Sequence, residues 1–372
     1  MKYIDEFRDA GAARALVACI GEEVQPGRSY RLMEFCGGHT HTIFRYGTPD
    51  VLPEGVTMVH GPGCPVCVLP IGRLDMAIAL ASKSNVILCT YGDMLRVPAS
   101  GRDTLQKCKG RGHDVRMVYS AMDALALAEK HPGQEIVFFA IGFETTTPGT
   151  AVVIQRAKAA GIKNFSVLCN HVLTPSAVMT ILEAPEVREL GSIPIDGFVG
   201  PGHVSSVIGT QPYEFFAEEY RKPVVIAGFE LLDVLQAIRG LVRQINEGRA
   251  EVENEYSRAV TRDGNSRAKA VVADVMELRR TFEWRGLGSV PYSGLAIRAA
   301  YANFDAEIRF DLPNVTVPER TGCRCGAVLR GVAEPRDCPL FGTVCTPEDP
   351  VGSCMVSSEG SCSAVYMYGA TR

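Results

Sequence analysis

The sequence of 372 residues contains no apolar run of the roughly 18 residues that a membrane-spanning helix needs. Its first residues are charged and lead into no apolar signal core, so neither a secretory signal nor a membrane anchor is expected. There is no long basic run, and the formal net charge is -4, which argues against nucleic acid as a partner. These absences predict a cytoplasmic protein.

The common signatures of nucleotide binding and hydrolysis are missing too. Neither G-x-x-x-x-G-K-[ST] nor G-x-G-x-x-G occurs, which removes the two clearest sequence arguments for a nucleotide site. G-x-S-x-G and H-E-x-x-H are also absent. No motif therefore supports an ATP-dependent step.

What the sequence does contain is cysteine, and its distribution is uneven. Six of the 13 cysteines lie within the last 50 residues, as Cys323, Cys325, Cys338, Cys345, Cys354 and Cys362. In a reducing compartment such density indicates metal ligation or redox chemistry rather than a disulfide framework. A [4Fe–4S] cluster needs four thiolates, which leaves two cysteines over. A zinc site is the alternative, and the spacing alone does not decide between the two.

Eight short apolar runs before residue 231 are typical of strands buried on both faces of a parallel sheet. The runs cover residues 31–35, 57–60, 85–90, 115–120, 135–141, 165–170, 197–200 and 223–227. Helical patterns at 74–82 and 121–130 provide candidate crossovers. The strands start every 26 to 30 residues in the first four and every 26 to 32 in the second four, which suggests two similar units.

After residue 231 the pattern changes, because 231–246 and 249–278 have the spacing of long helices. The predicted fold class is therefore α/β, with two similar parallel-sheet α/β units and a helical, cysteine-rich C-terminal iron–sulfur domain. We expect the first unit over 1–125, the second over 126–232, and the third domain over 233–372.

Chemically active residues follow several predicted strands, where ligands gather in open α/β sheets. Cys64-Pro65-Val66-Cys67 stands just before a predicted helix, whose N-terminus stabilises thiolate. This C-x-x-C pair is suited to disulfide exchange or soft-metal ligation, and its spacing does not separate these roles. The alternative is a buried structural pair in a tight turn.

Cys36 forms a second group with His39 and His41. One thiol and two imidazoles can hold iron or zinc, and the two intervening glycines let the backbone approach a ligand closely. We favour histidines that orient Cys36 or hydrogen-bond a ligand over histidines that ligate directly. The alternative is a free thiol beside solvent-facing histidines.

Further polar residues follow later strands. Glu144 with its threonines, and His203 with Ser205, are equally consistent with a functional role and with helix capping. For Asp93 and Arg96 a surface ion pair is the favoured interpretation.

Several blocks together resemble the HypD family of hydrogenase maturation factors. They are Phe-Cys-Gly-Gly-His-Thr-His at 35–41, Gly-Pro-Gly-Cys-Pro-Val-Cys at 61–67, Gly-Phe-Glu-Thr-Thr at 142–146, Gly-Pro-Gly-His-Val-Ser at 200–205, Cys-Arg-Cys-Gly at 323–326, and the block 352–360. The resemblance spans essentially the whole chain. It implies two similar α/β domains and a third domain that carries a [4Fe–4S] cluster.

The resemblance also implies partners. With a HypC-type chaperone, such a protein holds iron while cyanide and carbon monoxide are added to build the Fe(CN)₂CO group of [NiFe]-hydrogenases. A HypE-type donor supplies the cyanide as a thiocyanate made with HypF, and the finished group passes toward the hydrogenase large subunit. The protein would then be a redox-active assembly scaffold rather than a turnover enzyme.

Carried onto this chain, the resemblance makes Cys36 the thiolate that holds iron jointly with a HypC cysteine. Cys64 and Cys67 become the neighbouring redox pair, with iron contact at some stage. By likeness to ferredoxin:thioredoxin reductase, the cluster ligands are Cys323, Cys338, Cys345 and Cys362. Cys325 and Cys354 form the second redox pair, and the alternative assignment exchanges Cys354 and Cys362.

Electrons would then pass from the cluster through Cys325/Cys354 and Cys64/Cys67 to the iron. Two other classes compete with this interpretation. One is an iron–sulfur-dependent disulfide reductase, and the other is a binding scaffold in which no electrons move.

Overall fold

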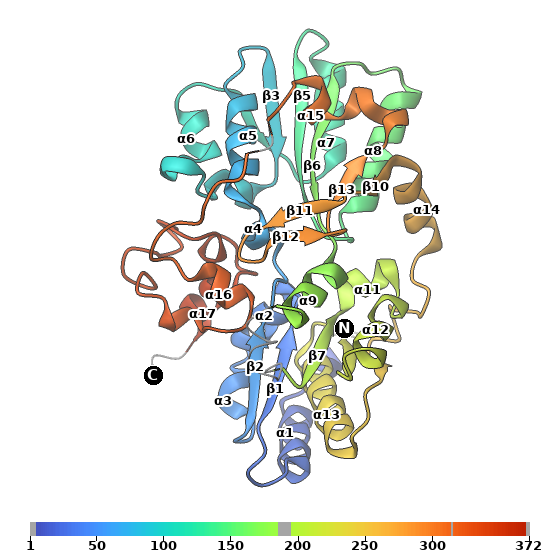
Figure 1. Ribbon diagram of the computed structural model, residues 1–372, viewed down its shortest axis with the longest axis vertical. Helices are drawn as coiled ribbons and strands as arrows, with labels where there is room; N and C mark the ends of the chain where they lie inside the picture. The colour runs from blue at the N-terminus through green and yellow to red at the C-terminus, as the bar shows by residue number, and fades with distance from the viewer. Residues whose placement is uncertain (1–4, 185–194, 314, 370–372) are drawn as a thin grey trace.

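Two parallel sheets organise the computed structural model, which describes residues 5–184, 195–313 and 315–369 (Figure 1). The larger sheet has the order β2-β1-β7-β8-β9 and the smaller one the order β4-β3-β5-β6. The larger sheet contains β1 (Tyr30–Glu34), β2 (Val56–His60), β7 (Gly197–Pro201), β8 (Val224–Ala227) and β9 (Val252–Asn254). The smaller sheet contains β3 (Val86–Thr90), β4 (Val115–Met117), β5 (Glu135–Gly142) and β6 (Phe165–His171).

Continuous apolar runs form these strands because both faces of each sheet are covered. Along β5, Val137 and Phe139 pack into one core, whereas Ile136 and Phe138 pack into another on the opposite face. Side chains alternate between the faces of a strand, so a strand buried on both sides needs apolar residues at every position. All eight predicted strands are therefore confirmed, with ends shifted by a few residues.

The sheets do not follow the expected sequential units of 1–125 and 126–232. β1 lies between β2 and β7, where Leu32 is paired with Gly197, and β3 pairs with both β4 and β5. β1 and β2 thus share a sheet with β7, β8 and β9, which come much later in the chain. Regular strand spacing reports how often the chain crosses a sheet, but it does not report which strands become neighbours.

Helices connect and cover the strands. The predicted helices at 74–82, 121–130 and 231–246 are confirmed as α5 (Ile71–Ala81), α7 (Ala121–Lys130) and α13 (Leu231–Glu247). The other α-helices described before residue 314 are α1 (Ala10–Glu23), α2 (Gly37–Arg45), α3 (Thr48–Val51), α4 (Pro65–Val68), α6 (Leu105–Gly110), α8 (Thr147–Ala159), α9 (Thr174–Leu182), α11 (Gly202–Ile208), α12 (Glu214–Glu218), α14 (Ser266–Val275) and α15 (Ala306–Arg309). In the parts of the chain that the structure describes, no helix is both long and apolar enough to cross a membrane.

The long helix predicted over 249–278 is wrong. Its first residues add β9 to the edge of the larger sheet by pairing with β8. α14 begins only after Asn265, whose side chain accepts a hydrogen bond from the backbone of Ala268 and caps the helix. Two short antiparallel pairs follow, β10 (Met276–Leu278) with β13 (Leu295–Ile297) and β11 (Thr281–Trp284) with β12 (Gly288–Pro291). Helical spacing was overridden here by strand pairing and by the turn-forming Asp-Gly-Asn at 263–265.

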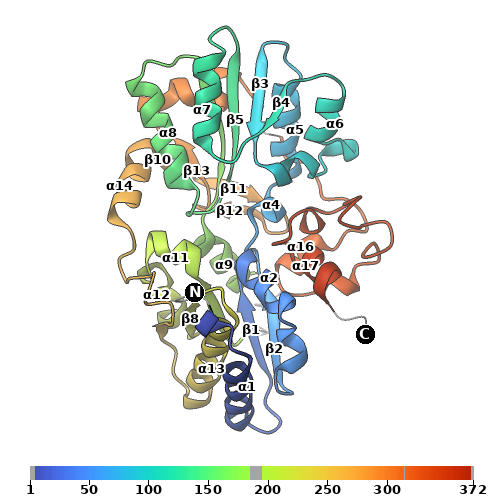
Figure 2. The same cartoon turned by 180° about the vertical axis from the view of Figure 1, so that it is seen from behind.

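The two sheets mark two lobes, the smaller sheet in the upper lobe and the larger sheet in the lower lobe of Figure 1. The cysteine-rich tail (315–369) lies beside the junction of these lobes rather than at the end of the molecule (Figures 1 and 2). It is built from short helices, namely α16 (Cys325–Leu329), α17 (Ser361–Tyr368) and the 3-10 turns η6 (Pro335–Asp337) and η7 (Ser353–Met355). The Arg96 guanidinium attaches it to the upper lobe by donating to the carbonyl oxygens of Pro347 and Val356, both at 2.9 Å. Arg96 is thus a tail anchor, and this bonding replaces the predicted surface role.

Candidate functional site

Cys36 follows β1 and Phe35 in the chain and occupies the N-cap position of α2. Its backbone N–H donates to Glu34 Oε2 at 2.8 Å, and the residue is only 8% exposed. Burial, together with the charges of Glu359 and Glu34, raises the pKa of the Cys36 thiol to about 12. The free thiol therefore keeps its proton at neutral pH, and a metal ion that binds it must displace that proton.

Glycines bring three distant segments together at Cys36. A Cβ at Gly63 would lie 2.3 Å from the Cys36 backbone nitrogen, so the loop that carries Cys64 runs directly against this residue. A Cβ at Gly37 would lie 2.4 Å from Glu359 Cβ of the tail. The backbone N–H of Gly37 also donates to the Gly63 carbonyl oxygen at 2.8 Å. The Cys36 loop, the Cys64 loop and the tail thus converge; the placement of the motifs after strands predicted this for the two loops but not for the tail.

Glu34 is a buried acidic residue that the sequence analysis did not single out. Its side chain is fully buried, and its Oε1 accepts hydrogen bonds from the Thr40 hydroxyl and from His60 Nδ1, the latter at 2.7 Å. Glu34 and His60 are paired residues of neighbouring strands β1 and β2. The only sequence signal was an acidic residue in an apolar strand two positions before Cys36.

The predicted histidines contact aromatic rings and backbone carbonyls. His39 Nε2 donates to the Gly228 carbonyl oxygen at 2.9 Å, and its ring stacks on Phe229 with centroids 4.8 Å apart. His203 also stacks on Phe229, at 3.8 Å, and His41 packs edge-on against Tyr368 at 5.3 Å. Burial lowers the pKa of both His39 and His203. The His39 contacts dock α2 onto the end of β8, and a direct role for the rings at Cys36 stays a prediction.

Cys64 and Cys67 are joined as a disulfide around the single turn of α4, with their Cα atoms 5.2 Å apart. Pro65 occupies the first position of that turn, where its missing N–H costs nothing. Both cysteines are buried, but Pro65 and Val66 line a pocket of about 420 Å³ together with Asp93 and Glu359. One turn of backbone, α4, thus separates the disulfide from a pocket that two acidic side chains line.

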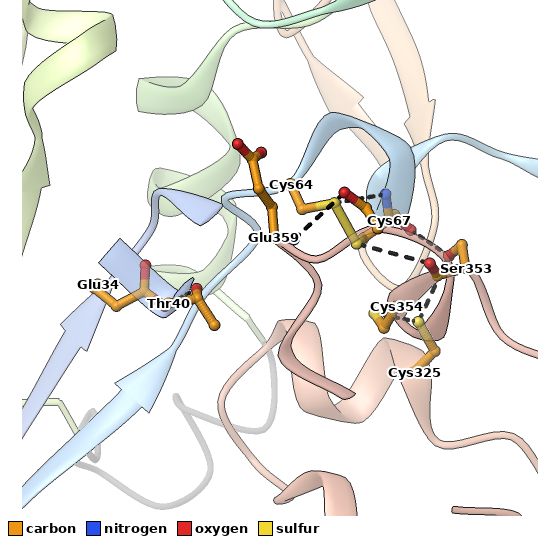
Figure 3. Close-up of a disulfide and its surroundings, with 9 residues drawn as sticks. Glu34, Thr40, Cys64, Cys67, Cys325, Ser353, Cys354 and Glu359 are labelled. Atoms are coloured by element: carbon orange, nitrogen blue, oxygen red, sulfur yellow. Dashed lines mark hydrogen bonds between the residues drawn. A yellow bond between two sulfur atoms is a disulfide. The ribbon is translucent and has the colours of Figure 1, made fainter. Parts of the chain in front are cut away.

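A second sulfur pair lies close to this disulfide (Figure 3). The Sγ atoms of Cys325 and Cys354 are 2.6 Å apart, although these residues are separated by 29 positions in the sequence. Ser353 stands between the two pairs, because its hydroxyl donates to the Cys67 carbonyl oxygen at 2.8 Å and lies 3.7 Å from Cys325 Sγ. Ser353 was missed from sequence, where only its position next to Cys354 pointed to it.

The other four tail cysteines lie around this pair. Cys323 contacts Cys325, and a Cβ at Gly352 would lie 2.8 Å from Cys323 Sγ. Burial, with the charges of nearby Cys362 and Cys338, raises the pKa of the Cys345 thiol, and its sulfur accepts a hydrogen bond from the Val351 N–H at 3.3 Å. Hydrogen bonds from Cys323 and Cys354, with the charge of Arg285, lower the pKa of Cys325.

Six thiols gathered in one region are a donor set that fits a group held by thiolates. Within the described residues, no three His, Cys, Asp or Glu side chains form a group that is arranged to hold a metal ion. The iron–sulfur cluster, and the division of the six cysteines into ligands and a redox pair, therefore stay predictions.

Glu144 lies in the turn after β5, buried to 5% exposure. Its Oε1 accepts a hydrogen bond from the backbone N–H of Thr174 at 2.9 Å, which places the carboxyl at the N-terminus of α9. Burial raises its pKa from the usual 4.5 to about 7. The side chain is thus tied to the start of a helix, and its functional role stays a prediction.

Replacing Glu144 by glutamine is expected to stabilise the protein at high pH only. Because the folded state holds this proton more tightly than the unfolded chain, its contribution to stability is complete below pH 4.5 and is lost as the pH rises through 7. The glutamine amide has no such proton to lose, so the free energy of unfolding at pH 8 should rise by about 1–3 kcal/mol over wild type. Denaturant unfolding at pH 5 and pH 8 measures this, with Glu129→Gln on the exposed face of α7 as the control. A gain in unfolding free energy of equal size at pH 5 would contradict the raised pKa of Glu144.

Comparison with known proteins gives matches over almost the whole chain. The HypD family model, described as the hydrogenase formation hypA family, matches residues 11–369. The hydrogenase maturation factor HypD of Cupriavidus necator is 65% identical over 369 residues, which covers 99% of this chain and 97% of the relative. HypD2 of Bradyrhizobium diazoefficiens is 63% identical over 372 residues, covering 100% and 98% of the two chains. HypD of Escherichia coli is 45% identical over 373 residues, covering 99% and 98%.

Proposed function

The chain belongs to the HypD family, and from that premise we propose that it is a hydrogenase maturation factor on which the Fe(CN)₂CO group is assembled. The observation that carries this proposal is the convergence of Cys36, the Cys64–Cys67 disulfide and the Cys325/Cys354 pair around one junction. A thiol for iron and two thiol pairs for electrons then lie within one region. The protein acts as a redox-active scaffold rather than as a turnover enzyme, and we place it in the cytoplasm.

Cys36 is the residue proposed to hold the iron, which is cargo rather than a resident group. Thiolate is a soft donor and suits low-spin iron that carries cyanide. Because burial keeps the free Cys36 protonated, iron binding releases a proton. Glu34 fixes the backbone of this residue, so that the sulfur is held in place before iron arrives. A HypC-type chaperone supplies the second cysteine ligand.

Cys323, Cys338, Cys345 and Cys362 are the residues that would hold a [4Fe–4S] cluster, which supplies single electrons when bound. The contact between Cys325 and Cys354 supports their assignment as the redox pair, over the alternative that exchanges Cys354 and Cys362. Both sulfurs are buried, so the pair is shielded from oxidants in solution. Their reduced form then carries two electrons toward the Cys64–Cys67 disulfide.

The transfer between the two pairs is a thiol–disulfide exchange. Cys325 as thiolate attacks Cys67 Sγ, which forms a Cys325–Cys67 bond and releases Cys64 as thiolate. Cys354 then attacks Cys325, which closes the Cys325–Cys354 disulfide and releases Cys67. Two electrons pass to the Cys64/Cys67 pair, and the protons lost by Cys325 and Cys354 end on Cys64 and Cys67. Ser353 binds Cys67 and lies beside Cys325, so it holds the two pairs in register.

The partners in this proposal follow the HypD family. A HypC-type chaperone shares the iron, a HypE-type donor brings cyanide, and HypF and the hydrogenase large subunit act before and after this step. The pocket beside α4 gives a partner access to the Cys64–Cys67 turn.

Infrared spectroscopy of the wild-type protein tests the function directly. We expect sharp cyanide and carbonyl stretching bands from the protein co-expressed anaerobically with its HypC-type chaperone and the cyanide-supplying enzymes. The same protein produced without the cyanide-supplying enzymes is the control and should lack the cyanide bands. No bands, combined with rapid turnover of a simple disulfide without any partner, would favour the second candidate, an iron–sulfur-dependent disulfide reductase. The observation in favour of that candidate is the Cys64–Cys67 disulfide itself.

A further inference from the structure

Arg285 is a buried cation, and within the described part of the chain two of its three side-chain nitrogens have no hydrogen-bond partner. The residue is 4% exposed, and neither its Nε nor its Nη2 has a hydrogen-bond partner among the described residues. The nearest acidic group is Glu319, whose Oε1 is 3.7 Å from Nε and whose side chain is 44% exposed. Buried arginines are normally paired on all sides, because an unpaired charged donor is costly to remove from water. A group that becomes negatively charged nearby would supply the missing partner.

The backbone around Arg285 contacts a residue next to each thiol pair. Its N–H donates to the Val68 carbonyl oxygen at 2.7 Å, one residue beyond Cys67. The next residue, Gly286, packs so closely on Gly326 that a Cβ there would lie 2.5 Å from the Gly326 Cα atom, one residue beyond Cys325. Arg285 is thus attached to the motif of each pair. It enters this place from the turn between β11 and β12, outside both cysteine motifs.

We propose that Arg285 stabilises the negative charge that develops on sulfur while electrons pass from Cys325/Cys354 to Cys64–Cys67. This inference rests on the proposed exchange between the pairs. In the first step, attack by Cys325 on Cys67 spreads one negative charge over Cys325, Cys67 and Cys64 as the new bond forms and the old one breaks. In the second step, attack by Cys354 on Cys325 spreads one negative charge over Cys354, Cys325 and Cys67. Both charges arise in a core shared by the α4 turn and the tail.

A fixed cation has its largest effect in such a place. The core around these sulfurs is dominated by apolar side chains, in which a charge is screened far less than in water. A guanidinium that is already desolvated and held by its backbone needs no rearrangement when the charge appears. Arginine also keeps its charge when buried. Arg285 is therefore an electrostatic residue of the exchange step rather than a nucleophile or ligand.

A trapped mixed disulfide measures the first bond-forming step. In the full-length Cys64→Ser/Cys354→Ser variant, isolated anaerobically, each pair keeps one thiol, and oxidised glutathione is added as the oxidant. Glutathione first caps Cys67, and Cys325 then displaces it to form the Cys67–Cys325 disulfide. Acid quenching and mass spectrometry of the linked peptides give the rate of this displacement.

We expect Arg285→Gln in this background to slow the formation of the Cys67–Cys325 disulfide at least tenfold, and Arg285→Met to do the same. Arg285→Lys should keep the rate within about threefold, since the charge is retained. Arg320→Gln is the matched control, because it removes a neighbouring guanidinium that is bound to the Ala99 carbonyl oxygen, and it should change the rate less than twofold. Circular dichroism establishes that each variant is folded.

The outcomes separate this inference from the exchange on which it rests. If Cys67 carries glutathione but the Cys67–Cys325 disulfide does not form with Arg285 in place, the exchange fails and the role of Arg285 fails with it. If the disulfide forms equally fast in the Gln and Met variants, the exchange stands and only the role of Arg285 is overturned. Equal slowing in the Lys variant also overturns it, because shape rather than charge would then decide the rate.

Discussion

Cys36→Ala is expected to abolish the cyanide and carbonyl infrared bands of the co-expressed complex completely. An alanine methyl group has no lone pair, so the protein loses its proposed ligand to the iron. Glu34 holds the backbone of this residue rather than its sulfur, and the hydrogen bond from the residue 36 N–H remains. The loss should therefore be chemical rather than structural, with the free energy of unfolding lowered by only about 1 kcal/mol.

Cys108→Ala is the matched control for this variant. Cys108 is a fully buried cysteine on α6 with no proposed part in the chemistry, so its removal should cost similar stability and leave the bands unchanged. Persistent bands in Cys36→Ala would mean that the iron is held elsewhere in the complex. Bands lost from both variants would mean that burial, not ligation, explains the effect.

Cys325→Ser should also stop assembly, but with a different signature. The hydroxyl at position 325 cannot form a disulfide with Cys354 or Cys67, so electrons reach neither the Cys64–Cys67 disulfide nor the iron. Iron–sulfur absorbance should remain, since Cys325 is not among the proposed ligands. We expect the infrared bands to disappear, and thiol labelling under reducing conditions should find Cys64 and Cys67 still oxidised.

Cys19→Ser is the control for this second variant, because Cys19 lies on α1, a helix of the lower lobe that packs on α13. Normal assembly in Cys325→Ser would rule out the relay. Loss of the iron–sulfur absorbance would instead show that Cys325 is a ligand, and the assignment of the six tail cysteines would have to change.

The strands could be predicted from sequence because each is a continuous apolar run bounded by turn residues. Their partners could not, since pairing of β1 with β7 depends on contacts between residues more than 160 positions apart. For the same reason the two sequential α/β units were not found. The helix expected at 249–278 failed because β9 gained more from pairing with β8 than from helical spacing.

The site shows the same division. The Cys36 and Cys64 loops were expected to converge because each follows the carboxyl end of a predicted strand, and they do. Glu34 and Arg285 were not found, because neither residue type is rare and neither stands in a motif. What distinguishes Glu34 is its register opposite His60, and what distinguishes Arg285 is burial with unused donors. Both properties exist only once distant segments have packed.

The strand order also bears on how the protein is made. The smaller sheet uses one uninterrupted stretch, from β3 to β6, so it can close while the ribosome is still working. The larger sheet has to wait, because β1 needs β7 on its other side and the sheet is complete only when β9 has emerged. Until then the nascent chain holds Cys36 on a two-strand fragment. The tail, whose Glu359 lies against Gly37, emerges later still, so the surroundings of the thiol proposed for iron are complete only in the finished chain.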